Sequence, residues 1–170
     1  GMDKISDITL SANWMPACGD ETENATMFDA VHAVGEELCP ALGIAIPVGK
    51  DSLSMKAVWS EDGVEKSVTS PMSLIITAFA PVQDVSGTLT AALNNTDSAL
   101  YRIDLSSGKL RLGGSILAQT LNQLGCDCPD LERPEDLANF FAFIQAAAKA
   151  GVIQAYHDIG DGGLIASVAE

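Results

Sequence analysis

Basic side chains are scarce in this sequence. Nine Lys and Arg stand against 23 Asp and Glu, which gives a formal net charge of -14. Non-specific binding of nucleic acid needs clustered Lys and Arg to neutralise phosphates, so the composition argues against a nucleic-acid partner. A nucleotide remains compatible with it, because metal ions and backbone N–H groups can hold phosphates.

Long apolar runs are also missing. The longest lies within 72–82 and falls well short of the roughly 20 residues that span a bilayer. The chain does not open with a basic segment followed by an apolar stretch, which a signal peptide requires. We therefore expect no membrane association and a cytoplasmic protein. Gly1 before Met2 is typical of the residue left by tag cleavage.

Cysteine and histidine do not fall in metal-binding patterns. Cys126 and Cys128 are too close together for a zinc knuckle, and no second pair lies near them. The two histidines, His32 and His157, lack finger spacing. We therefore interpret all the thiols as reduced, ordinary cysteines.

The composition is that of a globular protein, with 47% hydrophobic and 19% charged residues in 170. That length suits one domain or two small ones. The turn-rich segment 94–97 favours a boundary close to it, and we predict domains at 1–92 and 93–170. The expected fold class is mixed α/β (α+β).

Apolar spacing and turn residues predict the elements of the first domain. The polar segment 8–25, broken by Pro16 and Gly19, is expected to be a loop. A helix is predicted after it, stopped by Gly43. Asp62-Gly63 indicates a hairpin turn. The expected helix is 25–42, and the expected strands are 44–48, 52–60, 64–70 and 72–80.

The second domain is predicted to alternate strands and helices. Gly113 and Gly114 open one helix, Pro134 starts another, and Gly162-Gly163 leads into a last one. Because that last helix is cut off at Glu170, we expect the chain to be a truncation. The expected strands are 99–105 and 152–157, and the expected helices are 112–124, 133–151 and the segment after 163.

The segment 155–170 carries the clearest chemical pattern. A predicted strand leads through a turn with Asp158 and Asp161 to Gly162-Gly163 and a helix start. Helix starts attract anions, and Mg²⁺ prefers one or two carboxylates plus phosphate oxygens. The pattern therefore fits a magnesium–phosphate pair. A plain turn with Asp at helix-capping positions explains it as well.

Three further segments could contact a ligand. Lys50 and Asp51 lie in a predicted glycine-led turn, where Lys50 could neutralise a phosphate, although a solvated turn would have the same residues. Asn13 and Trp14 lie in the predicted first loop, where Trp14 could equally be a packing anchor. The glycines of 111–115 suit either a phosphate or close helix–strand packing.

The motifs in their order are more specific than any one of them. LSANWMPACG, FDAVHAVGEELCPALG, IPVGKDSLSMK, TSPMSLIITAFAPV, LGGSILAQ and AYHDIGDGGL occur in succession from residue 10 to the end. This succession resembles the large, single-chain form of phosphoribosylformylglycinamidine synthase (formylglycinamide ribonucleotide amidotransferase). That family uses ATP and glutamine to convert formylglycinamide ribonucleotide into formylglycinamidine ribonucleotide in purine biosynthesis.

The resemblance implies a partial fold of aminoimidazole-ribonucleotide-synthetase-like domains, with mixed sheets and helices on one face. Residues 1–92 would be the C-terminal part of an ATP-binding-type domain in the second half of the synthase core. Residues 93–170 would begin the following domain. The expected partners are the rest of the polypeptide, including its glutaminase domain, and a nucleotide substrate. Faces that normally pack against the missing domains could also pair the fragment as a homodimer.

The resemblance also assigns site residues. Asp158 matches a magnesium ligand of an auxiliary Mg-ADP site, and Lys50 is expected to contact phosphate or substrate. Gly160 stands where relatives often have a serine that contacts the nucleotide, so only its backbone could serve. No catalytic residue is expected, and the isolated chain should be inactive. A stand-alone nucleotide-binding or assembly module is the alternative, and a small kinase-like relative of the superfamily is a third.

Overall fold

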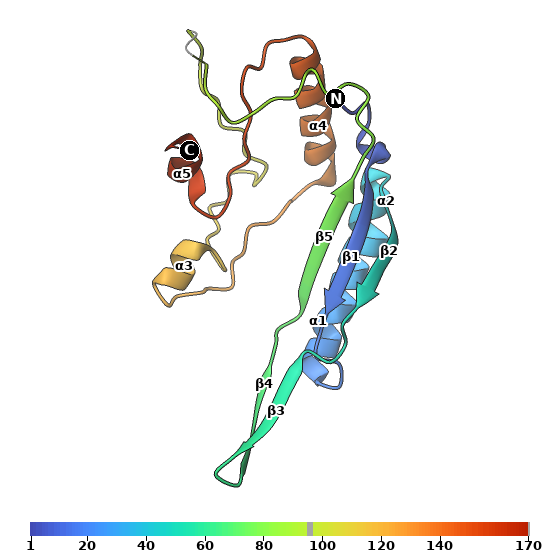
Figure 1. Cartoon of the computed structure of the whole chain (residues 1–170), viewed down its shortest axis with the longest axis vertical. Coiled ribbons are helices and arrows are strands. Elements are labelled where there is room, and N and C mark those ends of the chain that lie inside the picture. Colours follow the sequence, from blue (N-terminus) through green and yellow to red (C-terminus); the bar gives the residue numbers. More distant parts are fainter. Residues whose placement is uncertain (95–96, 170) are drawn as a thin grey trace. The chain divides into compact units, whose positions relative to one another are not determined.

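The computed structural model describes residues 1–94 and 97–169, so part of the predicted turn at 94–97 and the helix end at Glu170 lie outside the described residues. The chain divides into two compact units. One is Met2–Pro81, and the other is Val82–Glu170 together with Gly1 (Figure 1). The predicted boundary at 92/93 concerns the domains of the parent fold and stays a prediction.

The Met2–Pro81 unit is built on a three-stranded sheet in the order β2-β1-β5. The central strand β1 (Thr9–Met15) pairs parallel with β2 (Ala45–Asp51) and antiparallel with β5 (Ser73–Phe79). The parallel pair is joined by a helical crossover, as the geometry of parallel strands requires. The sheet is therefore mixed, and the predicted mixed α/β class is confirmed.

The predicted loop at 8–25 is wrong for its first part, because Thr9–Met15 form strand β1. Its residues alternate in burial, with Leu10 and Ala12 buried and Ser11 and Asn13 only half-buried. This two-residue period is that of a strand with one covered face. The prediction was wrong because the polar residues of the alternation were taken for a loop. The buried residues of this unit are Leu10, Ala12, Pro16, Ala17, Cys39 and Leu42.

A continuous helical segment follows, made of α1 (Glu21–Val31), the π-helical η2 (His32–Leu38) and α2 (Cys39–Leu42). The Asp20 side chain caps its start by accepting hydrogen bonds from the N–H groups of Thr22 and Glu23, at 3.0 and 3.3 Å. Gly43 ends it in the left-handed conformation, at φ 66°. The predicted helix is confirmed, and the cap explains why it begins earlier than residue 25. A single 3₁₀ turn, η1 (Ile5–Asp7), precedes β1.

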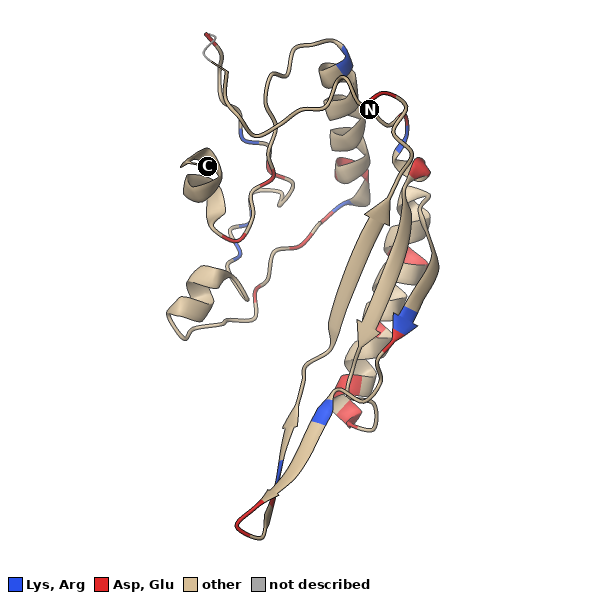
Figure 2. Cartoon of the chain, viewed as in Figure 1, with Lys and Arg blue, Asp and Glu red and all other residues tan. Residues whose placement is uncertain are grey.

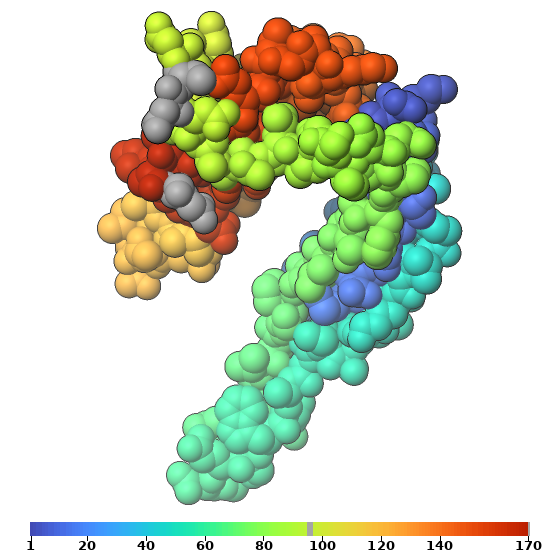
Figure 3. All heavy atoms as spheres, turned by 45° about the horizontal axis from the view of Figure 1, so that its top comes forward, coloured from blue at the N-terminus to red at the C-terminus, as the bar shows by residue number. Residues whose placement is uncertain are grey.

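The hairpin of β3 (Lys56–Glu61) and β4 (Val64–Thr69) forms a sheet of its own. Asp62 and Gly63 both have positive φ, which is the conformation that a two-residue hairpin turn of type I′ needs. The predicted hairpin is confirmed, although β3 starts later than residue 52. Figure 3 shows this ribbon at the end of its unit, and nearly all its residues are exposed.

The Val82–Glu170 unit contains α3 (Ile116–Thr120), α4 (Pro134–Lys149) and α5 (Gly163–Ala169). The predicted helices are present, but α3 is shorter than 112–124 because Gly114 and Asn122 both have positive φ at its ends. The predicted strands at 99–105 and 152–157 are wrong, since neither segment forms a strand. An extended segment forms a strand only when its backbone hydrogen-bonds repeatedly to a neighbouring extended segment. Within 152–157, Tyr156 N–H donates a single such hydrogen bond, to the carbonyl oxygen of Thr90.

Acidic residues gather at the start of α1 and at the tip of the β3–β4 hairpin (Figure 2). Glu21 and Glu23 in the first turn of α1 lie where the helix dipole favours negative charge. Among the residues that the structure describes, no helix is long and apolar enough to cross a membrane.

Candidate functional site

Lys50 lies near the end of β2, opposite Asn13 of β1 in the strand register. Its neighbour Asp51 lies opposite Trp14. The predicted glycine-led turn is therefore wrong, since Gly49, Lys50 and Asp51 all belong to the strand. Two segments that the sequence suggested separately are brought together here. A shallow cavity of about 280 Å³ is lined by Ala12, Trp14, Ile46, Pro47, Val48, Gly49, Lys50 and Asp51.

Gly49 allows β2 to lie against β1 at this point. A Cβ atom at Gly49 would stand 2.0 Å from the carbonyl oxygen of Ala12, its register partner. Only a residue without a side chain fits so close to another backbone. The glycine therefore has a packing role, and it fixes the position of Lys50 next to it.

The Asp158 carboxylate points into solvent, because its side chain is 89% exposed. The carbonyl oxygen of Asp158 accepts a hydrogen bond from Ser167 Oγ of α5 at 3.4 Å and is also contacted by His157 Nδ1. The carboxylate oxygen Oδ1 lies 3.9 Å from the same His157 nitrogen. Because the Ser167 hydroxyl has one proton and lies closer to the Gly163 carbonyl oxygen, at 3.2 Å, the main chain at Asp158 is only weakly held by α5, and its carboxylate is exposed.

The glycines after Asp158 differ in what they require. A Cβ at Gly160 would meet no atom within 4 Å, so a serine would fit there. A Cβ at Gly162 would stand 2.5 Å from Ala166 Cβ, and Gly163 has φ +73°, so both positions need glycine for the turn into α5. Gly162 is therefore explained by local packing and Gly163 by its backbone conformation, whereas neither reason applies to Gly160.

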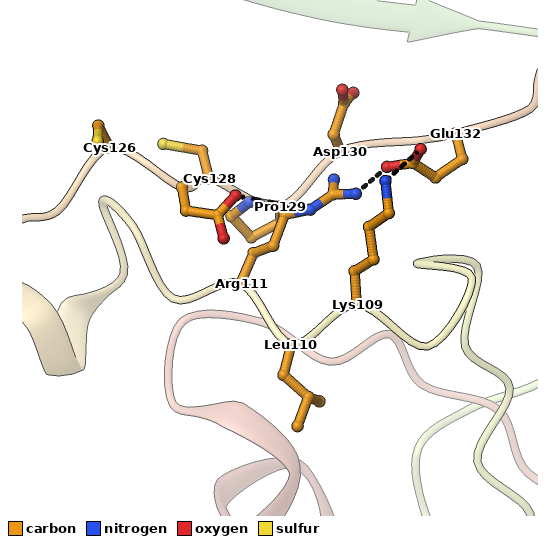
Figure 4. A pocket seen from close by; sticks show the side chains of 9 residues that line it. Lys109, Leu110, Arg111, Cys126, Cys128, Pro129, Asp130 and Glu132 are labelled. Atoms are coloured by element: carbon orange, nitrogen blue, oxygen red, sulfur yellow. Dashed lines mark hydrogen bonds and ion pairs between the residues drawn. The ribbon is translucent and has the colours of Figure 1, made fainter.

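A cavity of greater volume than the one beside β2 lies in a segment whose charged residues form no recognisable sequence motif (Figure 4). Lys109 and Arg111 both form ion pairs with Glu132; the Lys109 Nζ–Glu132 Oε2 distance is 2.7 Å. The Arg111 side chain is only 8% exposed. The cavity has a volume of about 560 Å³ and is lined by Lys109, Leu110, Arg111, Cys126, Asp127, Cys128, Pro129, Asp130 and Glu132.

The two glycines of 111–115 lie beside Asp127 and Cys128, which line this cavity. The Gly113 N–H donates to the Asp127 carbonyl oxygen at 2.9 Å, and a Cβ at Gly113 would lie 2.8 Å from the Asp127 backbone. Gly114 has φ +73°. Of the two explanations left open by the sequence, close packing therefore accounts for Gly113, whereas the left-handed backbone conformation accounts for Gly114. The packing partner is a loop, where the sequence had suggested a strand.

The Met2–Pro81 unit matches a known protein family. Residues 1–81 match the family model of the FGAR-AT PurM_N-like domain. The matched range coincides with the Met2–Pro81 unit. This unit therefore matches the FGAR-AT PurM_N-like domain over its whole length. The resemblance to phosphoribosylformylglycinamidine synthase is thereby confirmed for these residues, and it relates the chain to an enzyme family of purine biosynthesis.

The predicted site residues are divided between the units. Lys50 belongs to the PurM_N-like domain, whereas Asp158 and Gly160 share one turn of the other unit. No group of three or more His, Cys, Asp or Glu that could hold a metal ion occurs within 1–94 and 97–169. Mg²⁺ takes few protein ligands, usually one or two carboxylates with phosphate oxygens and water. The exposed Asp158 carboxylate fits one such ligand of a site completed by other groups.

Proposed function

We propose that the chain is part of phosphoribosylformylglycinamidine synthase, the ligase that converts formylglycinamide ribonucleotide, ATP and glutamine into formylglycinamidine ribonucleotide. The observation that carries the proposal is the match of residues 1–81 to the FGAR-AT PurM_N-like domain. The mixed sheet with its parallel β1–β2 pair agrees with that domain class. The rest of the polypeptide, including a glutaminase domain, would supply ammonia and the reacting centre in the cytoplasm.

Within that enzyme, the chain's role is to hold a nucleotide. Asp158 would be a ligand of Mg²⁺, whose charge offsets that of the nucleotide phosphates. The backbone at Gly160 would lie beside the nucleotide, because its side-chain position is open. Lys50 would contact a phosphate or the substrate as a point charge, held by the β1–β2 pairing. No residue of the chain is assigned a catalytic role.

The isolated chain is proposed to be inactive. Support comes from the turn of Asp158, where the exposed carboxylates of Asp158 and Asp161 cannot alone hold Mg²⁺ tightly. Exposed apolar side chains support it too, because β5 leaves Ile75 and Phe79 in solvent at 53% and 57% exposure. Faces of this kind suit contact with other protein surfaces, here the remainder of the polypeptide or a second copy of the chain.

The test of this proposal is amidine formation by the purified 170-residue chain with formylglycinamide ribonucleotide, Mg-ATP and ammonium chloride. Ammonia replaces glutamine, so a missing glutaminase domain cannot hide activity. We expect no turnover above the no-protein control, and turnover by the intact synthase under the same conditions. Product formation by the chain alone would refute its assignment as an inactive part.

The exposed Asp158 carboxylate beside α5 favours a second candidate, a stand-alone nucleotide-binding module. Calorimetry with ADP and Mg²⁺ separates the two functions. Submicromolar binding that is lost in Asp158→Asn and kept in Asp161→Asn would support the module. Binding weaker than millimolar, unchanged by either substitution, is what the ligase segment predicts.

A further inference from the structure

Two cysteines border the cavity beside Lys109 and Arg111 in the Val82–Glu170 unit. Cys126 and Cys128 are free and exposed, and both line the 560 Å³ cavity. The other two cysteines of the chain differ from them. Cys18 is exposed but has no second cysteine near it in sequence, and Cys39 is buried. The chain therefore contains one exposed dithiol together with two natural control thiols.

The residue between the two thiols is held chiefly at its backbone. The Asp127 carbonyl oxygen accepts the 2.9 Å hydrogen bond from Gly113, and Asp127 Oδ1 lies 3.8 Å from Arg111 Nε. The Cα atoms of residues two apart in a chain are separated by at most roughly 7 Å, which is close to the usual disulfide limit of about 6.8 Å. Figure 4 shows the Cys128 sulfur directed to the side where Cys126 lies.

We propose that Cys126 and Cys128 are a modification site at which a low-molecular-weight disulfide oxidises the pair to an intrachain disulfide. One cysteine thiolate attacks a sulfur of the small disulfide, forming a mixed disulfide and releasing one small thiolate. The second cysteine thiolate attacks the protein sulfur of that mixed disulfide and releases the other. The two cysteine protons pass to the two released thiols, and the small disulfide accepts the two electrons.

The charge of the cavity selects among disulfides. The three acidic lining residues Asp127, Asp130 and Glu132 outnumber Lys109 and Arg111, and both basic side chains are already paired with Glu132. The chain as a whole carries a net charge of -14. A cationic disulfide therefore reaches these thiols more readily than an anionic one. Cystamine represents the first class and oxidised glutathione the second.

The experiment uses the whole chain with Cys18→Ser, so that the lone exposed thiol does not react. The protein is incubated with cystamine, quenched with acid and analysed by mass spectrometry and by free-thiol titration. We expect the loss of two free thiols and of two hydrogen atoms, with no retained adduct, and full reversal by dithiothreitol. Cys126→Ser should instead retain one cystamine half at Cys128. Stable adducts on both Cys126 and Cys128 would overturn the proposal.

Two further measurements test whether the folded structure matters. The ratio of closed disulfide to mixed disulfide should be at least several-fold higher in buffer than in urea, since only the folded chain fixes Asp127. An equal ratio would overturn the geometric argument. Cystamine should also react faster than oxidised glutathione at low salt, with the difference shrinking as salt is added. Equal rates at low salt would overturn the proposed selectivity.

Discussion

Gly49 of β2 lies against the backbone of Ala12 of β1, closer than any side chain would permit. Ala12 is fully buried, with an exposed fraction of 0%. The contact therefore joins the core of the PurM_N-like domain to the strand that carries Lys50. It explains why a glycine precedes that lysine.

Substituting Gly49 with alanine should weaken the sheet. The new Cβ would meet the Ala12 carbonyl oxygen at 2.0 Å, so β2 must move away from β1. We expect a loss of about 2–3 kcal/mol in the free energy of unfolding, as for other overpacked sites. Urea unfolding followed by circular dichroism measures it. The control is Gly35→Ala in η2, where no atom lies within 4 Å, and its stability should be unchanged or raised.

Removing the cap of α1 should destabilise the same unit. Asp20 accepts hydrogen bonds from two N–H groups that would otherwise lack a partner in the helix. Asp20→Ala is expected to cost about 1 kcal/mol of stability. The matched control is Asp29→Ala, which removes an exposed carboxylate from the body of the same helix. If both variants unfold at the same urea concentration, the capping interaction contributes nothing.

Cys39 should be the last thiol to react with an alkylating agent. Burial raises the pKa of its thiol, so less of the reactive thiolate is present than at an exposed cysteine. Because the folded state raises this pKa, the thiol's contribution to stability is complete below its unfolded pKa of about 8.5. It is lost as the pH rises from there towards the folded pKa.

The measurement is alkylation by iodoacetamide at pH 8, followed by peptide mass spectrometry. Cys18 serves as the exposed reference in the same chain. Cys39→Ser should also flatten the decline of stability between pH 8 and pH 10, because the ionising group is gone. Equal labelling of Cys39 and Cys18 in the folded protein would contradict the burial seen here.

Lys50→Met in the intact synthase should weaken the binding of its phosphate-bearing ligand. Loss of one charge-assisted contact corresponds to a fall in affinity of roughly tenfold or more. The KM values for formylglycinamide ribonucleotide and ATP, together with the Kd for Mg-ADP, identify which ligand Lys50 contacts. Lys56→Met on the β3–β4 hairpin is the control, because it removes an equal charge away from the β2 cavity. If the Lys50→Met and Lys56→Met variants have the same KM values and the same Kd for Mg-ADP, Lys50 does not make the proposed contact.

The outer face of the three-stranded sheet should drive self-association of the isolated chain. Ile75 and Phe79 lie opposite Asn13 and Thr9 in the register, so they share one face of β5 and both are exposed. Light scattering should show a dimer at high protein concentration that the double variant Ile75→Ser and Phe79→Ser reduces to a monomer. Val85→Ser, an exposed apolar position of the other unit, should leave the mass unchanged.

Turn and helix-end residues in the sequence predicted the elements that are determined by neighbouring residues in the chain. The positive-φ pair Asp62-Gly63 makes the hairpin, and Gly43 ends the helix that starts at Asp20. Strand β1 was missed because its two buried residues, Leu10 and Ala12, alternate with polar neighbours. The segments 99–105 and 152–157 have strand-like residues, but a strand also needs a neighbour, which residue preferences cannot supply.

The candidate site was predicted less completely than the fold. Sequence alone suggested both Asn13 and Lys50, but only the β1–β2 register places them opposite each other. The pairing of Arg111 with Glu132 could not be predicted, since the two residues are 21 positions apart and no motif links them. Opposite charges in an acidic chain are too common to indicate a partner. The roles of Lys50, Asp158 and Gly160 stay predictions.

The antiparallel edge of β1 has a consequence for synthesis of the protein. Its partner β5 is the last strand of the unit, and Thr9 pairs with Phe79. As the nascent chain leaves the ribosome, β1 emerges first and can pair with β2 soon afterwards. It must then wait for the hairpin and β5 to be translated, and closing that long loop is slow. During that interval the open edge of β1 is available to a chaperone or to another nascent chain.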